Sequence, residues 1–172
     1  WINDISVTWY DNTILARDYA GYIAEMNAGY VAILPDGKLT IKQHNTASKF
    51  SINIDDCEDF VLGTKFQITK VVYDNGIVKY EAGNDTGNTI YINSENVFIV
   101  NQSQIDNIYN SIKNFEFYNI STGNCPINGN VHAGDVITFI DGDNEYPTIA
   151  NVNMTYNVGW YGGYSLDINN QR

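Results

Sequence analysis

Hydrophobic and polar positions along the chain divide into two windows of helical spacing and many alternating runs. Apolar side chains recur three or four positions apart near residues 14–27, which places them on one face of an α-helix. A second window near residues 103–113 aligns Ile105, Ile108 and Ile112 in the same way. We therefore predict two helices, capped at their N-termini by Thr13 and Ser103.

Most of the remaining chain alternates apolar and polar residues, as half-buried β-strands do. The turns Pro35-Asp36-Gly37-Lys38 and Asp74-Asn75-Gly76 each separate two such runs and indicate hairpins. Strands are predicted at residues 30–34, 39–42, 50–54, 65–73, 77–80, 89–93, 97–100, 115–120, 136–140, 148–156 and 164–168. The segment between the strands at 77–80 and 89–93 is so rich in Gly and Asn that we expect an irregular turn there.

These elements predict an α+β, β-rich fold in two parts. Residues 1–46 form a small subdomain of one helix and one β-hairpin, and a polar loop around residues 43–48 ends it. Residues 47–172 favour a barrel or a sandwich interrupted by the helix near 103–113, and we expect an antiparallel β-barrel with this one inserted helix.

Two regions far apart in the chain carry a family resemblance. The first is the helix, its Asn27-Ala28-Gly29 end, where a left-handed turn is expected, and the hairpin closed by Asp36-Gly37-Lys38. The second contains Gly134-Asp135 before a strand, the acidic turn Asp141-Gly142-Asp143-Asn144-Glu145, and the strand end Thr155-Tyr156-Asn157. In this order they resemble the tail-tip hub proteins of long-tailed bacteriophages and prophages, roughly from Val7 to Ile168.

The resemblance implies a non-enzymatic structural protein of the virion tail tip, assembled in the bacterial cytoplasm. Hubs of this kind form homotrimeric rings that join the tail tube to the fibre or lysin, with tail-tube or distal tail proteins as neighbours. Because the sequence begins at Trp1 instead of Met, we expect a fragment or a processed product that lacks the upstream barrel of the hub. The alternative, from a different functional class, is a carbohydrate- or receptor-binding module of a tail or cell-surface protein.

The charge and composition of the chain limit the kinds of partner and compartment that we expect for it. The net charge of −11 arises from 20 acidic and 9 basic residues, and only Arg17 and Arg172 supply guanidinium groups, so specific nucleic-acid binding is not expected. The charge fits either ordinary solubility or a surface that must not retain DNA. No apolar run approaches the ~20 residues of a membrane span. Cys57 and Cys125 lie far apart, which favours two reduced thiols and a reducing compartment over a disulfide framework.

Side chains that could carry chemistry are few. The acidic run Asp55-Asp56-Cys57-Glu58-Asp59 could bind calcium but is more typical of a solvated loop, and the turn at 141–145 lacks the later ligands of a calcium loop. His44 and His132 are far apart, lie beside no plausible nucleophile, and are expected at the surface. We therefore expect no catalytic residues, no cofactor and no metal.

Aromatic residues are the remaining functional signal. Trp160 and Tyr161 stand in a glycine-rich hairpin tip that hub proteins usually fill with small residues. They are the possible contact residues, since aromatic faces bind sugars and anchor protein interfaces. Two interpretations stay open: an exposed contact, or a tip folded back on its own barrel.

Overall fold

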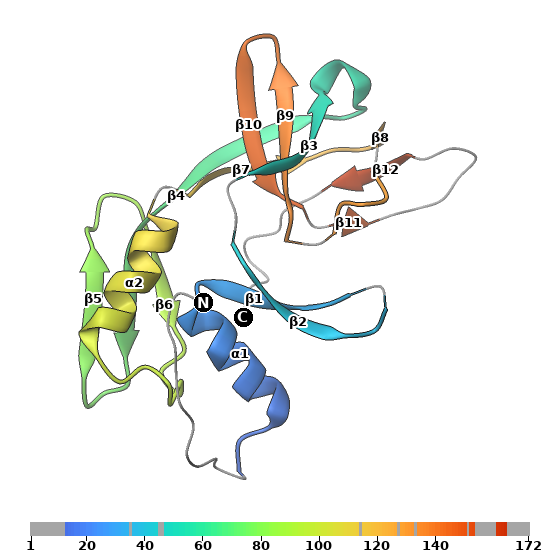
Figure 1. The fold of residues 1–172 in the computed structure, drawn as a ribbon. Helices are drawn as coiled ribbons and strands as arrows, with labels where there is room; N and C mark the ends of the chain where they lie inside the picture. Colours follow the sequence, from blue (N-terminus) through green and yellow to red (C-terminus); the bar gives the residue numbers. More distant parts are fainter. Residues whose placement is uncertain are drawn as a thin grey trace. The chain divides into compact units, whose positions relative to one another are not determined.

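The structure is a computed structural model of the 172-residue chain. It describes residues 13–34, 36–44, 47–113, 115–126, 128–132 and 134–150, with the backbone alone at 152–153 and 161–164. The described residues are mostly β-strand with two α-helices (Figure 1), which confirms the β-rich α+β class. They divide into two compact units, Trp1–His44 with Gln67–Phe115 (unit 1) and Asn45–Phe66 with Glu116–Arg172 (unit 2). Residues 67–115 thus group with the N-terminal helix and hairpin.

Unit 1 begins with the predicted helix and hairpin. Helix α1 (Ala16–Met26) is followed by the antiparallel strands β1 (Gly29–Ile33) and β2 (Leu39–Gln43), in a register that pairs Gly29 with Gln43. The N-cap is Leu15, without a side-chain cap, so the prediction of a Thr13 cap is wrong. The backbone at Leu15 is extended, so the N-cap lies two residues after the predicted one at Thr13. The Leu15 carbonyl accepts the first helical hydrogen bonds. The helix ends with Ala28 in the left-handed region at φ 50°.

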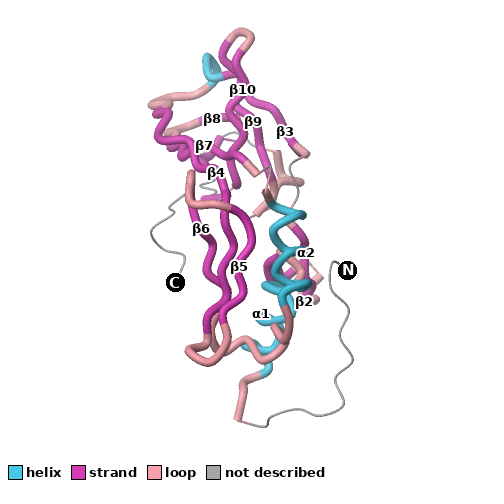
Figure 2. The backbone as a smooth tube through the Cα atoms, turned by 90° about the vertical axis from the view of Figure 1, so that its left-hand side faces the viewer, coloured by secondary structure: helices cyan, strands magenta, loops and turns pink. Residues whose placement is uncertain are grey.

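A mixed sheet and the second helix complete unit 1. Strand β4 (Val61–Asp74) belongs to unit 1 from Gln67 onward. It lies between β5 (Lys79–Gly83), which is antiparallel to it, and β6 (Asn88–Ile92), which is parallel to it. Helix α2 (Gln102–Ile112) packs against β5 (Figure 2). Asn101, not Ser103, caps α2, because the Asn101 side chain accepts the Gln104 N–H while the Gln104 side chain returns to the Asn101 backbone.

Unit 2 contains short strands around one apolar core. Its strands are β3 (Ser48–Asn53), β7 (Glu116–Ser121), β8 (Cys125–Pro126), β9 (Val136–Asp141), β10 (Asn144–Ile149), β11 (Val152–Asn153) and β12 (Tyr161–Tyr164), with a single 3-10 turn η1 (Ile54–Asp56). The sheets have the orders β10-β9-β3 and β11-β12-β8, and β7 pairs with β4. The buried core consists of Ile52, Ile120, Cys125, Val131, Ile137, Phe139 and Ala150.

Strand direction departs from the expected antiparallel barrel. Both β3–β9 and β4–β6 are parallel pairs, so the uniformly antiparallel arrangement is wrong. Such pairs join segments that are not neighbours in a hairpin, and no local turn signal reports them. None of the sheets among the described residues closes on itself, and barrel closure is therefore not seen in this part of the chain.

The predicted strand at residues 97–100 is a turn instead. Side chains there occupy the backbone groups that a strand would pair: Asn96 accepts the Phe98 N–H at 3.1 Å, and the Gln104 side chain accepts the Val100 N–H at 2.8 Å. The Gln104 amide also donates to the Phe98 carbonyl at 2.9 Å. The apolar pattern of this segment reflects packing before α2, not strand pairing.

Candidate functional site

The Gly134-Asp135 pair forms a structural clamp at the entry of β9. Gly134 has φ 85°, a left-handed conformation that favours glycine, and its N–H donates to the Ala150 carbonyl at 2.8 Å. The Asp135 side chain, only 12% exposed, accepts the His132 N–H at 2.9 Å and the Lys49 ammonium at 3.0 Å. This motif residue therefore holds β3 and the segment before β9 together and leaves little carboxylate surface for a ligand.

The acidic segment at residues 141–145 is a tight hairpin turn, as predicted. Asp141 pairs with Asn144 across β9 and β10, and Gly142 adopts φ 57° in the two-residue connection. The Asn144 side chain donates to the Asp141 carbonyl at 3.3 Å. The third part of the C-terminal pattern, Thr155-Tyr156-Asn157, lies outside the described residues.

The acidic run at residues 55–59 lies around the single-turn η1. The Asn53 side chain accepts the Asp55 N–H at 3.1 Å, and the Glu58 carboxylate accepts the Asn124 amide at 2.7 Å. Asp59 takes a positive φ of 52°. Across the part of the chain that the structure describes, no three His, Cys, Asp or Glu side chains converge as a metal-ligand set, so the calcium interpretation of this run gains no support.

The two histidines have different surroundings. His44 is half-buried against aromatic rings, with its ring centroid 5.3 Å from Tyr30 and 6.0 Å from Phe115, and its expected surface position is therefore wrong. Burial lowers the pKa of His44, which favours the neutral ring. His132 has a side chain 42% exposed, with Nδ1 3.6 Å from the Asp135 carboxylate.

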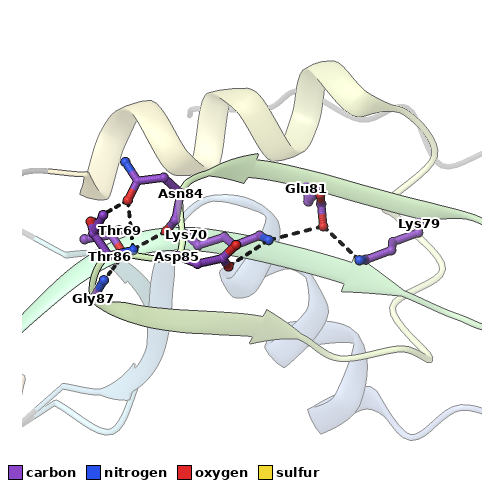
Figure 3. A network of polar contacts seen from close by, with 8 residues as sticks. All are labelled: Thr69, Lys70, Lys79, Glu81, Asn84, Asp85, Thr86 and Gly87. Carbon is purple, nitrogen blue, oxygen red and sulfur yellow. Dashed lines mark hydrogen bonds and ion pairs between the residues drawn. The ribbon is translucent and has the colours of Figure 1, made fainter.

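A network of charged side chains crosses the β5–β4 pair in unit 1 (Figure 3). The Lys70 ammonium, on a side chain 14% exposed, lies 3.0 Å from Asp85 and 3.4 Å from Glu81, and Glu81 also pairs with Lys79 at 2.9 Å. The side-chain hydrogen bonds to Asp85 and Glu81 raise the pKa of Lys70 and Lys79, respectively. Both lysines stay charged and are matched by carboxylates.

The same close-up shows that the expected irregular turn between β5 and β6 is an ordered crossover (Figure 3). The Thr69 hydroxyl donates to the Asn84 carbonyl at 2.9 Å and accepts the Gly87 N–H at 2.9 Å. The Asn84 side chain in turn accepts the N–H and hydroxyl of Thr86. A Cβ on Gly83, at φ 99°, would collide with the Thr69 carbonyl, so the glycine permits this close approach.

Ion pairing extends to other basic residues among the described ones. Lys65 lies 2.7 Å from Glu116, Lys38 lies 2.8 Å from Asp36, and Arg17 lies 3.4 Å from Asp18. The whole chain has 20 acidic and 9 basic residues, so carboxylates remain in excess even where every basic side chain has an acidic partner. Each of these cations thus has a carboxylate beside it, which partly offsets its attraction for a phosphate backbone.

The predicted contact residues Trp160 and Tyr161 lie at the edge of the part of the chain that the structure describes. Trp160 lies outside the described residues. The backbone of Tyr161 begins β12 and pairs with Pro126 of β8, while the Tyr161 side chain also lies outside them. The choice between an exposed contact and a folded-back tip stays a prediction.

The structure also reveals a buried amide that the sequence analysis missed. Asn96 is 0% exposed and donates to the Tyr22 carbonyl and to the Glu25 carboxylate, both at 3.0 Å. It thereby joins α1 to the segment between β6 and α2. One asparagine among 24 carries no local signal that would single it out.

Comparison with solved structures finds a tail protein among the structural neighbours of this chain. No protein-family model matches the chain, and no curated protein matches it. A superposition on the crystal structure of the tail protein from Neisseria meningitidis MC58 has a TM-score of 0.47 and 9% sequence identity. It covers 84% of this chain and 51% of the other, so the chain spans about half the length of that tail protein. No helix within the described residues is long and apolar enough to cross a membrane.

Proposed function

We propose that this chain is a non-enzymatic, structural segment of a phage or prophage tail-tip hub. In the longer natural chain it helps to form a homotrimeric ring that connects the tail tube to the fibre or lysin. Its partners are further copies of itself and the neighbouring tail-tube or distal tail proteins. The assembled position is the virion tail tip, after assembly in the bacterial cytoplasm.

The role of the motif residues carries this proposal. The positions that carry the hub resemblance lie at joints of the fold: Ala28 ends α1, Gly134 and Asp135 clamp the entry of β9, and Gly142 closes the β9–β10 hairpin. Such residues specify how strands are placed and not how a substrate reacts. A protein whose role is assembly needs its turns and strand ends conserved in shape, and these are the positions that carry the resemblance.

Charge supports the same role. The DNA of a phage must pass a tail ring, and a lumen with few free cations avoids the phosphate contacts that would retain it. Lys65, Lys70 and Lys79 are each paired with a carboxylate. The proposal requires that the ring lumen be acidic or neutral. We also propose that the β-strands of residues 50–168 join an upstream β-barrel in the longer chain and that the two together form the ring.

Exposed apolar side chains offer contact area for assembly. Ile33 and Leu39 lie directly opposite each other at the end of the β1–β2 hairpin, with 75% and 60% of their surfaces exposed. Both belong to the hairpin that carries the first part of the resemblance. In the proposed ring, this hairpin end is covered by a neighbouring subunit or tail protein.

Immunogold labelling of whole virions tests the proposed position. Antibodies raised against residues 1–172 should label one end of the tail, at the tip, and omit the capsid and the tail shaft. Labelling of the capsid alone, or of host cell walls without particles, would contradict the proposal.

An assay on cell walls tests the proposed lack of enzymatic activity. Purified protein should release no fragments from cell walls. Cell-wall hydrolysis that disappears when one Asp or Glu is replaced would show an enzyme instead.

The alternative is a carbohydrate- or receptor-binding module, and the aromatic pair Trp160 and Tyr161 favours it. Under this alternative, Trp160→Ala removes binding of the protein to host cells or to an isolated cell-wall glycan and leaves the melting temperature within about 2 °C. Tyr91→Ala is the matched control, because Tyr91 is a 75% exposed aromatic of β6. A large fall in melting temperature for Trp160→Ala would assign the side chain to packing.

A further inference from the structure

The two cysteines of the chain are neighbours in unit 2, although they are far apart in sequence. Cys125 in β8 is fully buried in the apolar core, and Cys57, which follows η1, packs against the same cluster from a half-buried position. The nearby Cys125 thiol is one of the causes that raise the pKa of Cys57. Both are free thiols in the structure.

Backbone hydrogen bonds fix the two segments beside each other. The Glu58 N–H donates to the Asn124 carbonyl at 2.7 Å, and the Gly123 N–H donates to the Glu58 carbonyl at 2.8 Å. One residue thus faces two, as in an antiparallel pair with a β-bulge. The Asn124 side chain adds a hydrogen bond of 2.7 Å to the Glu58 carboxylate.

This register brings Cys57 opposite Cys125. In an antiparallel pair, the next residues outward from a hydrogen-bonded pair face each other with their Cα atoms about 4.5 Å apart. Disulfides span Cα separations of about 4.4–6.8 Å. A pairing with this register places the two cysteines at a spacing of the kind that a disulfide can bridge.

We propose that Cys57 and Cys125 form a reversible intramolecular disulfide by exchange with a small-molecule disulfide such as oxidised glutathione. The Cys57 sulfur, after losing its proton, attacks one glutathione sulfur, which breaks the glutathione disulfide and releases one glutathione thiol. The Cys125 sulfur, after losing its proton, then attacks the Cys57 sulfur of the mixed disulfide and releases the second glutathione. Two protein thiols are oxidised and one glutathione disulfide is reduced to two thiols.

The surroundings assign the order of attack. Cys57 is the partly exposed member, so the reagent reaches it first, whereas Cys125 acts from inside the core on a sulfur that is already adjacent. Burial, together with Cys125 and Asp56, raises the pKa of Cys57 to about 12. Thiolate is therefore scarce at neutral pH, and exchange in the folded protein is slow, which calls for long incubation or refolding in the redox buffer.

The cross-link would join the end of η1 to β8, the strand that pairs with β12. Cys125 pairs with Gly162 and Pro126 pairs with Tyr161, so β8 holds the start of β12, directly after Trp160. A covalent bond between Cys57 and Cys125 closes a long loop and restricts the unfolded chain. Unit 2 is then stabilised when the protein leaves a reducing compartment.

The test is refolding of the full chain in glutathione redox buffers, followed by mass spectrometry and peptide mapping without reductant. We expect a monomer lighter by two hydrogens, with the Cys57 and Cys125 peptides joined. The equilibrium constant for forming this disulfide should be at least about tenfold larger in native buffer than in concentrated urea, since folding already aligns the thiols. The oxidised form should melt about 5–15 °C higher than the reduced form.

Single-cysteine variants provide the controls. Cys57→Ser removes the half-buried partner and Cys125→Ala removes the fully buried one. Cys125→Ala should yield only a mixed disulfide of Cys57 with glutathione. Because Cys125→Ala could impair folding, the comparison of wild-type protein in native buffer and in urea decides independently. Mixed adducts or disulfide-linked dimers as the main wild-type products, an equal or smaller constant in native buffer, or a lower melting temperature after oxidation would overturn the proposal.

Discussion

Unit 1 buries amide side chains in its core, whereas the core cluster of unit 2 consists of apolar side chains and one thiol. Asn27, Asn96 and Gln104 are at most 7% exposed in unit 1 and bond backbone groups of turns and helix ends. Unit 2 instead places Ile137 and Phe139, both 0% exposed, on the single strand β9. A buried amide is satisfied in one arrangement of its neighbours only, while apolar contacts tolerate several. The stability of unit 1 therefore depends on specific hydrogen bonds of buried amides, and that of unit 2 depends on close packing of apolar side chains.

The largest expected effect tests the packed core of unit 2. Phe139→Ala removes a fully buried ring that lies 5.3 Å from Phe60, and it should destabilise unit 2 by about 3–5 kcal/mol. Urea denaturation followed by hydrogen exchange will measure the change in the free energy of unfolding of each unit. Val61→Ala, at a residue 58% exposed in the same unit, should change stability by less than about 0.5 kcal/mol. Equal losses from the two variants would contradict the assigned core.

Asn96→Ala tests the polar core of unit 1. The substitution removes bonds to the Tyr22 carbonyl, the Glu25 carboxylate and the Phe98 N–H, and it should cost about 3 kcal/mol. Amide exchange in α1 should accelerate most. The matched control is Asn110→Ala, at an exposed asparagine on α2 whose side chain accepts the Lys113 ammonium, with an expected change within about 0.5 kcal/mol. A loss below about 1 kcal/mol for Asn96→Ala would remove the contrast between the units.

Gly83→Ala tests the crossover between β5 and β6. At φ 99° and against the Thr69 carbonyl, an added Cβ must shift backbone, with an expected cost of about 1–3 kcal/mol. Gly76→Ala is the control, because φ is 80° there and nothing lies within 4 Å of the added Cβ, so only the conformational cost of about 1 kcal/mol applies. If both variants lose the same free energy of unfolding, the close approach at Gly83 contributes nothing.

The smallest effect concerns pH. Burial raises the pKa of Glu25, and the Asn96 hydrogen bond offsets this only in part. The native state therefore holds the Glu25 proton to higher pH than the unfolded chain, and this contribution to stability is full below pH 4.5 and is lost as pH rises through the folded pKa. Glu25→Gln keeps an acceptor for Asn96 and removes the titration. Wild type should lose more stability than the variant from pH 4 to 7; parallel curves would refute the burial effect.

Local patterns in the sequence predicted the elements better than their pairing. Helical spacing located α1 and α2, and the Asp-Gly-Lys and Asp-Asn-Gly turns located two hairpins, because each signal lies within a few residues. The parallel pairs β3–β9 and β4–β6 were missed, since partners distant in sequence leave no local pattern. The strand predicted at 97–100 failed because side chains of Asn96 and Gln104 supplied its hydrogen bonds.

The candidate site divides in the same way. The hairpin turn at Asp141 followed from local residue types, whereas the half-buried position of His44 depends on Tyr30 and Phe115 and required the fold. The proximity of Cys57 and Cys125 likewise arises from a contact between distant segments. Residue type indicated which groups exist, and tertiary contacts decided which of them meet.

The most direct test of the proposed hub is the mass and symmetry of the longer natural chain, measured by light scattering and electron microscopy. We predict a threefold ring with an acidic or neutral lumen. A variant with Ile33→Ser and Leu39→Ser should keep its fold and lose ring assembly, while Ile77→Ser, at a residue 91% exposed, should still assemble. A stable monomer, a twofold dimer, or a lumen lined by Lys65, Lys70 and Lys79 would contradict the assignment.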